Sequence, residues 1–165
     1  MSQDDPLSAQ HWLQVAVDAT RETGETSLGC ESISQIDGAG AKPTSAEGAY
    51  VPLVASKERF LLGMLASETT CQSLARRLLG MEDDEEEPTQ EDVADAVGEI
   101  VNIVAGVMQR QLADAVGAVE LGLPFYVRGK VATTDKHEVG VCNLDLDGMG
   151  IELVVVRGGE RAQGG

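Results

Sequence analysis

The feature that most constrains the fold is a long proline-free stretch over residues 89–115, TQEDVADAVGEIVNIVAGVMQRQLADA. Thr89 is a suitable N-cap, and Asp92 completes a capping box three residues later. The apolar residues recur three or four positions apart and so share one stripe of a helix: Val93, Val97, Ile100, Val104 and Met108. The stretch therefore predicts one long central helix with a buried face.

The opposite face of this helix carries a small polar group. At about 100° per residue, Asp95, Glu99 and Asn102 fall together on the side away from the apolar stripe. The residues around them have almost no side chain: Ala94, Gly98, Ala105, Gly106 and Ala113. This pattern predicts a polar face that another backbone could approach closely.

The segments before the long helix alternate between helix and strand patterns. A helical stripe over residues 7–22, ending near Gly24, predicts a first amphipathic helix, and residues 30–36 alternate like a short strand. A hairpin is predicted from the apolar runs 49–55 and 59–66, with Pro52 placing the first run at an edge or a bulge. A second helix then follows, with a cap at Ser67 and a stop at Gly80.

The segments after the long helix read as strands. Residues 119–123 lead into Pro124, and the runs 125–133, 138–146 and 150–156 predict an antiparallel meander. The fold class expected from this order is α+β, with helices packed on an antiparallel sheet. We expect one domain over residues 1–165, with loose ends at about 1–6 and 157–165.

Composition excludes several classes of protein. The net charge of -16, from 28 acidic and 12 basic residues, argues against nucleic acid as a partner. No apolar run is long enough to span a membrane, no signal peptide is evident, and the mean hydropathy is -0.08, so we expect a cytoplasmic protein. Three separated cysteines without CxxC spacing predict free thiols.

Two acidic segments resemble metal sites only superficially. Asn143, Asp145, Asp147 and Gly148 match the first half of an EF-hand loop, but Val154 stands where the bidentate acid is needed. The six acids of residues 82–87 follow one another without turn residues, which predicts a solvated linker rather than a cation site.

The remaining candidate chemistry lies on the polar face of the long helix. Neither His11 nor His137 belongs to a recognisable nucleophile motif. An amide such as that of Asn102 can hold a water, and a carboxylate such as that of Glu99 can pair with a partner's cation. Such a pair suits an already activated substrate, for example an acyl phosphate with its own metal ion. From the residues alone, a merely solvated helix face stays open as the commoner arrangement.

The spacing Asp95-x-x-x-Glu99-x-x-Asn102, with Pro124 about twenty residues further on, resembles the signature of the CheC/CheX/FliY phosphatases of bacterial chemotaxis. Residues 60–81, FLLGMLASETTCQSLARRLLGM, resemble the strand–helix unit of the same family. We judge the resemblance to cover residues 51–156. A single motif on one helix resembles the CheX arrangement, which implies a homodimer of α+β fold.

The resemblance implies roles for the motif residues. Glu99 would pair with the active-site lysine of a phosphorylated CheY-like response regulator, and Asn102 would orient water for attack on its aspartyl phosphate. Asp95 and Pro124 would have supporting roles. The chain itself would bind no cofactor, and Mg²⁺ would belong to the receiver domain.

Two alternatives to a phosphatase remain. One is a non-catalytic adaptor that docks a receiver domain on the same face, and the other is a structural protein that dimerises through its sheet. The presence of both Glu99 and Asn102 favours the enzyme. The sequence does not identify the response regulator, nor a role for residues 82–87 or for the first fifty residues.

Overall fold

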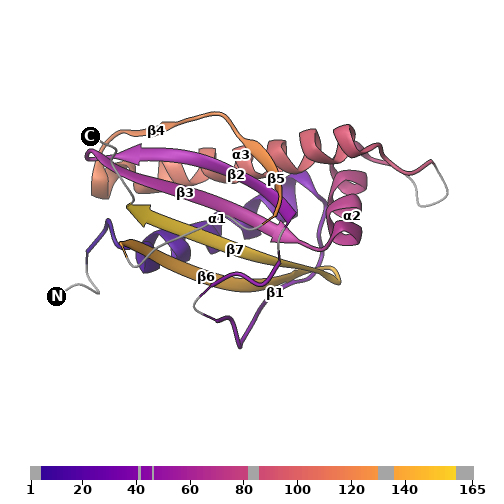
Figure 1. Cartoon of the computed structure of the whole chain (residues 1–165), viewed down its shortest axis with the longest axis horizontal. Coiled ribbons are helices and arrows are strands. Elements are labelled where there is room, and N and C mark those ends of the chain that lie inside the picture. Colours follow the sequence, from indigo (N-terminus) through magenta and orange to yellow (C-terminus); the bar gives the residue numbers. More distant parts are fainter. Residues whose placement is uncertain (1–4, 41, 46, 82–85, 130–135, 159–165) are drawn as a thin grey trace.

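The described part of the chain forms an antiparallel sheet with three helices on one face (Figure 1). The computed structural model describes residues 5–40, 42–45, 47–81, 86–129 and 136–158. The helices are α1 (Ala9–Ser27), α2 (Glu68–Leu79) and α3 (Gln90–Val116). The strands are β1 (Ile33–Ile36), β2 (Glu47–Ala55), β3 (Glu58–Ala66), β4 (Val119–Leu121), β5 (Phe125–Arg128), β6 (His137–Leu146) and β7 (Met149–Gly158). The predicted α+β class, with one long helix, is confirmed.

The strand order is β1-β6-β7-β3-β2-β4, and β5 also pairs with β2. The predicted meander of the last three strands is therefore wrong. Strands β6 and β7 form a hairpin, but β5 pairs with β2, near the opposite edge of the sheet. Strand β4 pairs with residues 53–55 of β2, and β5 pairs with residues 47–50. Pro52 lies where one partner gives way to the other, and its carbonyl accepts a hydrogen bond from the Gly122 N–H at 2.8 Å. The predicted edge position or bulge at Pro52 is wrong, because β2 has partners on both sides and its register with β3 continues through Pro52. The proline, which cannot donate to a ladder, lies instead in the gap between the β4 and β5 pairings.

Both ends of α2, the start of α3 and the first hairpin follow the predicted signals. The Ser67 hydroxyl accepts from the Thr70 N–H at the start of α2, and Gly80 ends that helix with φ at 69°. The capping box of Thr89 and Asp92 is present at the start of α3. The β2–β3 turn consists of Ser56 and Lys57, whose φ angles are 51° and 69°. This two-residue turn matches the twist of the strands it joins.

Helix α1 differs from its prediction because it continues through Gly24 to Ser27. A Cβ added at Gly24 would lie only 2.7 Å from Cδ1 of Ile33. The glycine therefore permits a close approach of β1 to the helix rather than ending the helix. Sequence alone does not distinguish these two uses of glycine.

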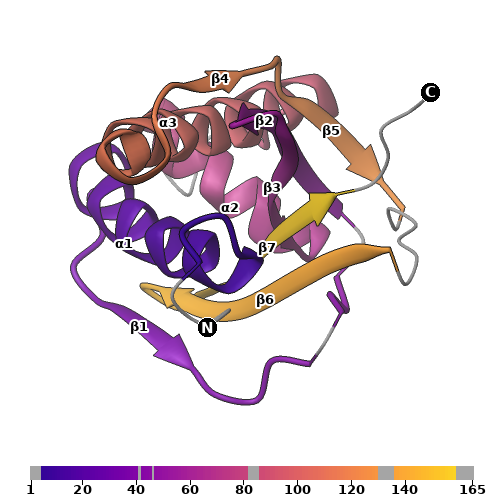
Figure 2. The ribbon, with the colours of Figure 1, turned by 90° about the vertical axis from the view of Figure 1, so that its left-hand side faces the viewer.

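The main core lies between the helices and the sheet. Trp12 of α1 is fully buried, and its ring stacks on Phe60 of β3 with centroids 3.6 Å apart. Alternate residues of β2 face the same core: Ala49, Val51, Leu53 and Ala55. Turning the molecule by 90° shows α1 and α3 side by side on this face of the sheet (Figure 2).

The outer face of the sheet carries a second, smaller apolar cluster. Its buried members are Tyr50, Leu65, Val154 and Val156. Glu152 of β7 is buried beside them, and its carboxylate accepts hydrogen bonds from the N–H groups of Thr44 and Ser45. Burial raises the pKa of Glu152, but these hydrogen bonds outweigh it and hold the pKa below its ordinary value. The connection between β1 and β2 is thereby attached to this face.

The EF-hand-like residues lie in the β6–β7 hairpin, as the strand interpretation predicted. The carboxylate of Asp147 accepts hydrogen bonds from the N–H groups of Glu31 and Ser32 and from the Arg77 guanidinium. The two backbone hydrogen bonds, together with that guanidinium, lower the pKa of Asp147. Asp147 thus joins the end of the hairpin to α2 and to the segment before β1.

The C-terminal boundary also differs from its prediction. Arg157 and Gly158 belong to β7 rather than to a polar tail. Arg157 forms ion pairs with Asp5, Glu58 and Glu138 at 3.2 to 3.5 Å. Residues 1–4, 159–165 and 82–85, which include most of the acidic block, lie outside the described residues. Among the described helices, none is long and apolar enough to cross a membrane.

Candidate functional site

The polar group of α3 lies at the surface of the sheet–helix layer. Asp95 and Glu99 are exposed and Asn102 is half-buried, while Val97 and Val101 between them are buried. Glu99 and Asn102 are three residues apart, which separates them by about 4.5 Å along the helix axis and keeps them on neighbouring positions of one face. The predicted clustering on one face is confirmed.

These side chains have no partner in the described part of the chain. Neither Asp95 nor Glu99 makes an ion pair or a hydrogen bond with a described residue, and the Asn102 amide makes no side-chain hydrogen bond there. A half-buried amide and an exposed carboxylate without partners among the described residues are free to engage a group brought by another molecule.

Pro124 packs directly against this helix. A Cβ added at Gly98 would lie 3.7 Å from Cβ of Pro124, which is ordinary contact distance. The group that approaches α3 at Gly98 is therefore the Pro124 side chain of the chain's own β4–β5 connection. Ala105 is also fully buried. The close approach that the small residues predict is made at Gly98 by the chain's own β4–β5 connection, and Ala105 faces the core.

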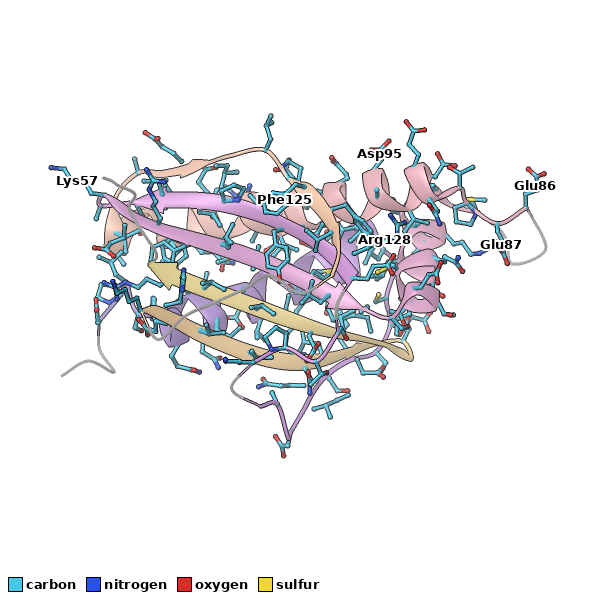
Figure 3. The ribbon with its side chains drawn as sticks, viewed as in Figure 1. Lys57, Glu86, Glu87, Asp95, Phe125 and Arg128 are labelled. Atoms are coloured by element: carbon cyan, nitrogen blue, oxygen red, sulfur yellow. The ribbon has the colours of Figure 1, made fainter. Side chains whose placement is uncertain are left out.

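A shallow hollow of ≈ 240 Å³ lies between α3 and β5 beside the polar group. We call it the α3–β5 hollow; it is lined by Ala94, Asp95, Gly98, Glu99, Pro124, Phe125 and Tyr126. Figure 3 shows Asp95 on α3 near the upper edge of the view, with Phe125 and Arg128 lower on β5 and Lys57 at the opposite end of the molecule. Asn102 is not among the lining residues, because it lies further along α3.

Strand β5 supplies a fixed wall for this hollow. The Tyr126 hydroxyl donates a 2.6 Å hydrogen bond to Oε2 of Glu47. Burial, together with hydrogen bonds to Cys71 and Glu47, raises the pKa of the Tyr126 phenol. Arg128 pairs with Glu47 at 3.5 Å and lies over the Tyr126 ring at 5.2 Å. Phe125, on the other side of the strand, stacks against Tyr50 with centroids 5.8 Å apart.

Sequence reasoning missed Phe125 and Tyr126 as parts of the site. The chain holds only two Phe, two Tyr and one Trp, and two of these five stand together directly after Pro124. That concentration was an available signal. The role of Arg128 as partner of Glu47 depends on the pairing of β5 with β2, which the predicted meander did not contain.

The described residues contain no group of three or more His, Cys, Asp or Glu side chains that could hold a metal ion. The site therefore offers hydrogen bonding, charge pairing and apolar contact. Its donors and acceptors lie along one face of a single helix.

These features define a class: a small α+β protein that presents a Glu-x-x-Asn pair from one long helix, beside a proline from the next connection. The family model described as "Chemotaxis phosphatase CheX" matches residues 51–145, and the chain belongs to this family. The resemblance predicted from the motif and from residues 60–81 is confirmed. No curated protein sequence matches the chain.

Solved structures share the fold at low sequence identity. The chemotaxis protein CheX from Vibrio vulnificus is 16% identical, with a TM-score of 0.70 over 88% of this chain and 98% of its own. The CheX in a CheX–CheY–BeF3–Mg complex from Borrelia burgdorferi is 23% identical, with a TM-score of 0.71 over 88% of this chain and 96% of its own. A CheC-like superfamily protein from Shewanella sp. PV-4 is 19% identical, with a TM-score of 0.68 over 90% of this chain and 97% of its own.

Proposed function

We propose that this chain is a phosphatase that hydrolyses the aspartyl phosphate of a CheY-like response-regulator receiver domain. The observation that carries the proposal is the pair of Glu99 and Asn102, which share one outward face of α3 and have no side-chain partner among the described residues. Membership of the CheX family supports the reaction. The complex of the Borrelia burgdorferi relative with CheY supports the kind of partner.

Glu99 has the role of docking and alignment in this proposal. Its carboxylate is exposed and forms no ion pair with a basic side chain among the described residues. A receiver lysine that pairs with it would fix the position of α3 over the receiver's active site, because a charge-assisted hydrogen bond has a preferred geometry as well as a favourable energy.

Asn102 has the role of holding the attacking water. Its amide can accept one hydrogen bond and donate another, so a water between it and the phosphoryl group has a defined orientation. The water oxygen forms the new bond to phosphorus while the bond from phosphorus to the aspartyl oxygen breaks. The products are the free carboxylate and inorganic phosphate, which carries the proton released by the water. The amide is not a base and takes no proton, so its contribution is positional.

Mg²⁺ is proposed to belong to the receiver, where it would neutralise charge on the transferred phosphoryl group. Asp95 and Pro124 are proposed to support the site, Pro124 by packing on Gly98. We also propose, from the family resemblance, that the chain works as a homodimer in the cytoplasm. Sedimentation of the purified protein tests the dimer.

The test is the loss of acyl phosphate from a phosphorylated CheY-type receiver domain of the same cell, with Mg²⁺, in the presence of wild-type protein or of Asn102→Ala. We expect acceleration by the wild type and a decrease of about 100-fold in that acceleration for the variant. Asn102→Asp is a matched control of similar shape that places a charge where the amide was. A fully active Asn102→Ala protein contradicts the mechanism. Binding without acceleration by the wild type supports the adaptor instead.

A further inference from the structure

The α3–β5 hollow is too small for a typical metabolite and has the size of a side chain. Its volume is ≈ 240 Å³, below the range of about 300–1,000 Å³ usual for small-molecule pockets. It corresponds to the share of liquid volume of about eight water molecules. It opens at the surface beside Glu99, so whatever fills it arrives together with the partner of that carboxylate.

The lining of the hollow combines apolar walls with a charged margin. Pro124 and Tyr126 provide the walls, and Asp95 and Glu99 provide the margin. Phe125 also lines the hollow, while its ring stacks on Tyr50. Phe125 remains 41% exposed and the preceding Leu123 is 85% exposed. Large apolar side chains so exposed beside a polar site indicate a contact surface.

The charge around the hollow is of one sign. Helix α3 carries Glu91, Asp92, Asp95 and Glu99 in its first half, and no Lys or Arg before Arg110. None of the residues lining the hollow is basic. Arg128, on the same strand, is already paired with Glu47. A cation on a partner would therefore meet a hollow whose lining carries only negative charge.

From these observations we propose that the α3–β5 hollow receives a lysine or arginine side chain of the receiver domain, in a contact additional to the lysine that pairs with Glu99. This rests on the proposed function. The aliphatic stem packs against Pro124 and Tyr126, and the charged group reaches Asp95.

The geometry separates this contact from the chemistry. Asp95 precedes Glu99 by four residues and Asn102 by seven, which is about 6 Å and about 10 Å along the helix axis. The receiver's basic residue would therefore lie at the edge of its active site, away from the phosphoryl group. The contact contributes to affinity and choice of receiver rather than to the rate of hydrolysis. Because the Tyr126 hydroxyl is already held by Glu47, the wall is formed before binding.

The experiment measures the KM and kcat for phosphorylated receiver, and the Kd for a CheY-type receiver activated with beryllofluoride and Mg²⁺. Asp95→Asn and Phe125→Ala are expected to raise KM and Kd about fivefold each, with kcat within about twofold of wild type. The Kd of Asp95→Asn should also depend less on salt. Asp114→Asn, an exposed carboxylate further along the same helix, and Leu79→Ala, an exposed apolar residue of α2, are the matched controls and should match wild type.

A charge-reversal pair identifies the occupant. Asp95→Lys should weaken binding further, and one Lys→Glu or Arg→Glu change near the receiver's active site should restore it. KM and Kd values equal to wild type for both Asp95→Asn and Phe125→Ala would overturn this proposal, and so would the failure of every receiver variant to restore binding. Either result would leave the proposed phosphatase function untouched. A change in sedimentation for Phe125→Ala, with unchanged Kd, would assign the surface to a second copy of the chain and overturn it as well. Absence of any binding or acceleration by the wild type would instead refute the proposed function.

Discussion

Replacing Gly98 by alanine tests whether the β4–β5 connection rests against α3 as the structure shows. A glycine in a helix interior lowers the free energy of unfolding by about 1 kcal/mol relative to alanine. The new Cβ would lie 3.7 and 3.9 Å from Cβ and Cγ of Pro124, so Pro124 need not move. We therefore expect Gly98→Ala to raise the free energy of unfolding by about 0.5–1 kcal/mol. This corresponds to an increase of about 1–4 °C in Tm.

Gly98→Leu is the opposing variant. Its longer side chain would occupy the space of Pro124, and we expect the free energy of unfolding to fall by about 1–3 kcal/mol. The assay is urea unfolding followed by the fluorescence of Trp12, which is the single tryptophan and is fully buried. Gly98→Ala should keep the proposed phosphatase activity, and Gly98→Leu should lose it as the connection moves. A loss of stability in Gly98→Ala as large as in Gly98→Leu would refute the packing that places Pro124 beside the site.

Three further changes probe other parts of the molecule. Gly63→Ala would place a Cβ 2.6 Å from the Tyr50 ring, so thermal melting should show a loss of about 1–3 kcal/mol, and unchanged stability would disprove the contact. Folding lowers the pKa of Asp147, so the stabilisation from its carboxylate is present above about pH 4 and is lost as pH falls through the folded pKa. Asp147→Asn should therefore lower the free energy of unfolding at neutral pH, and its difference from the wild type should narrow in acid. A difference that stays constant with pH would argue against this role of Asp147. Glu99→Ala should weaken binding to a beryllofluoride-treated receiver by about 1–3 kcal/mol, whereas equal affinity in a titration would remove Glu99 from its docking role.

The parts of the fold that sequence predicted are those set by local chemistry. The caps at Ser67 and Thr89 and the stop at Gly80 follow from hydrogen bonds within a few residues, and all are present. The face shared by Asp95 and Glu99 follows from helix geometry alone. These features depend on neighbours in sequence, which a single sequence shows.

The parts that sequence did not predict depend on tertiary packing. Strand β5 pairs with β2, about seventy-five residues earlier, and nothing in its own pattern distinguishes that edge from β6. Gly24 reads as a helix stop but serves a close contact with Ile33. The hollow beside Glu99 exists only because β5 lies there. Its charged residues on α3 could be predicted from helix geometry, whereas the contribution of β5 depends on a strand pairing that the sequence did not predict.

The most direct test of the central claim is turnover by this chain with a large molar excess of phosphorylated receiver and Mg²⁺. A catalyst that acts in trans should release many equivalents of inorganic phosphate per chain, and Asn102→Ala should release none above the receiver's own rate while still binding it. Phosphate release that stays at the receiver's own rate with wild-type protein, despite measurable binding, would contradict the claim and leave a receiver-binding adaptor.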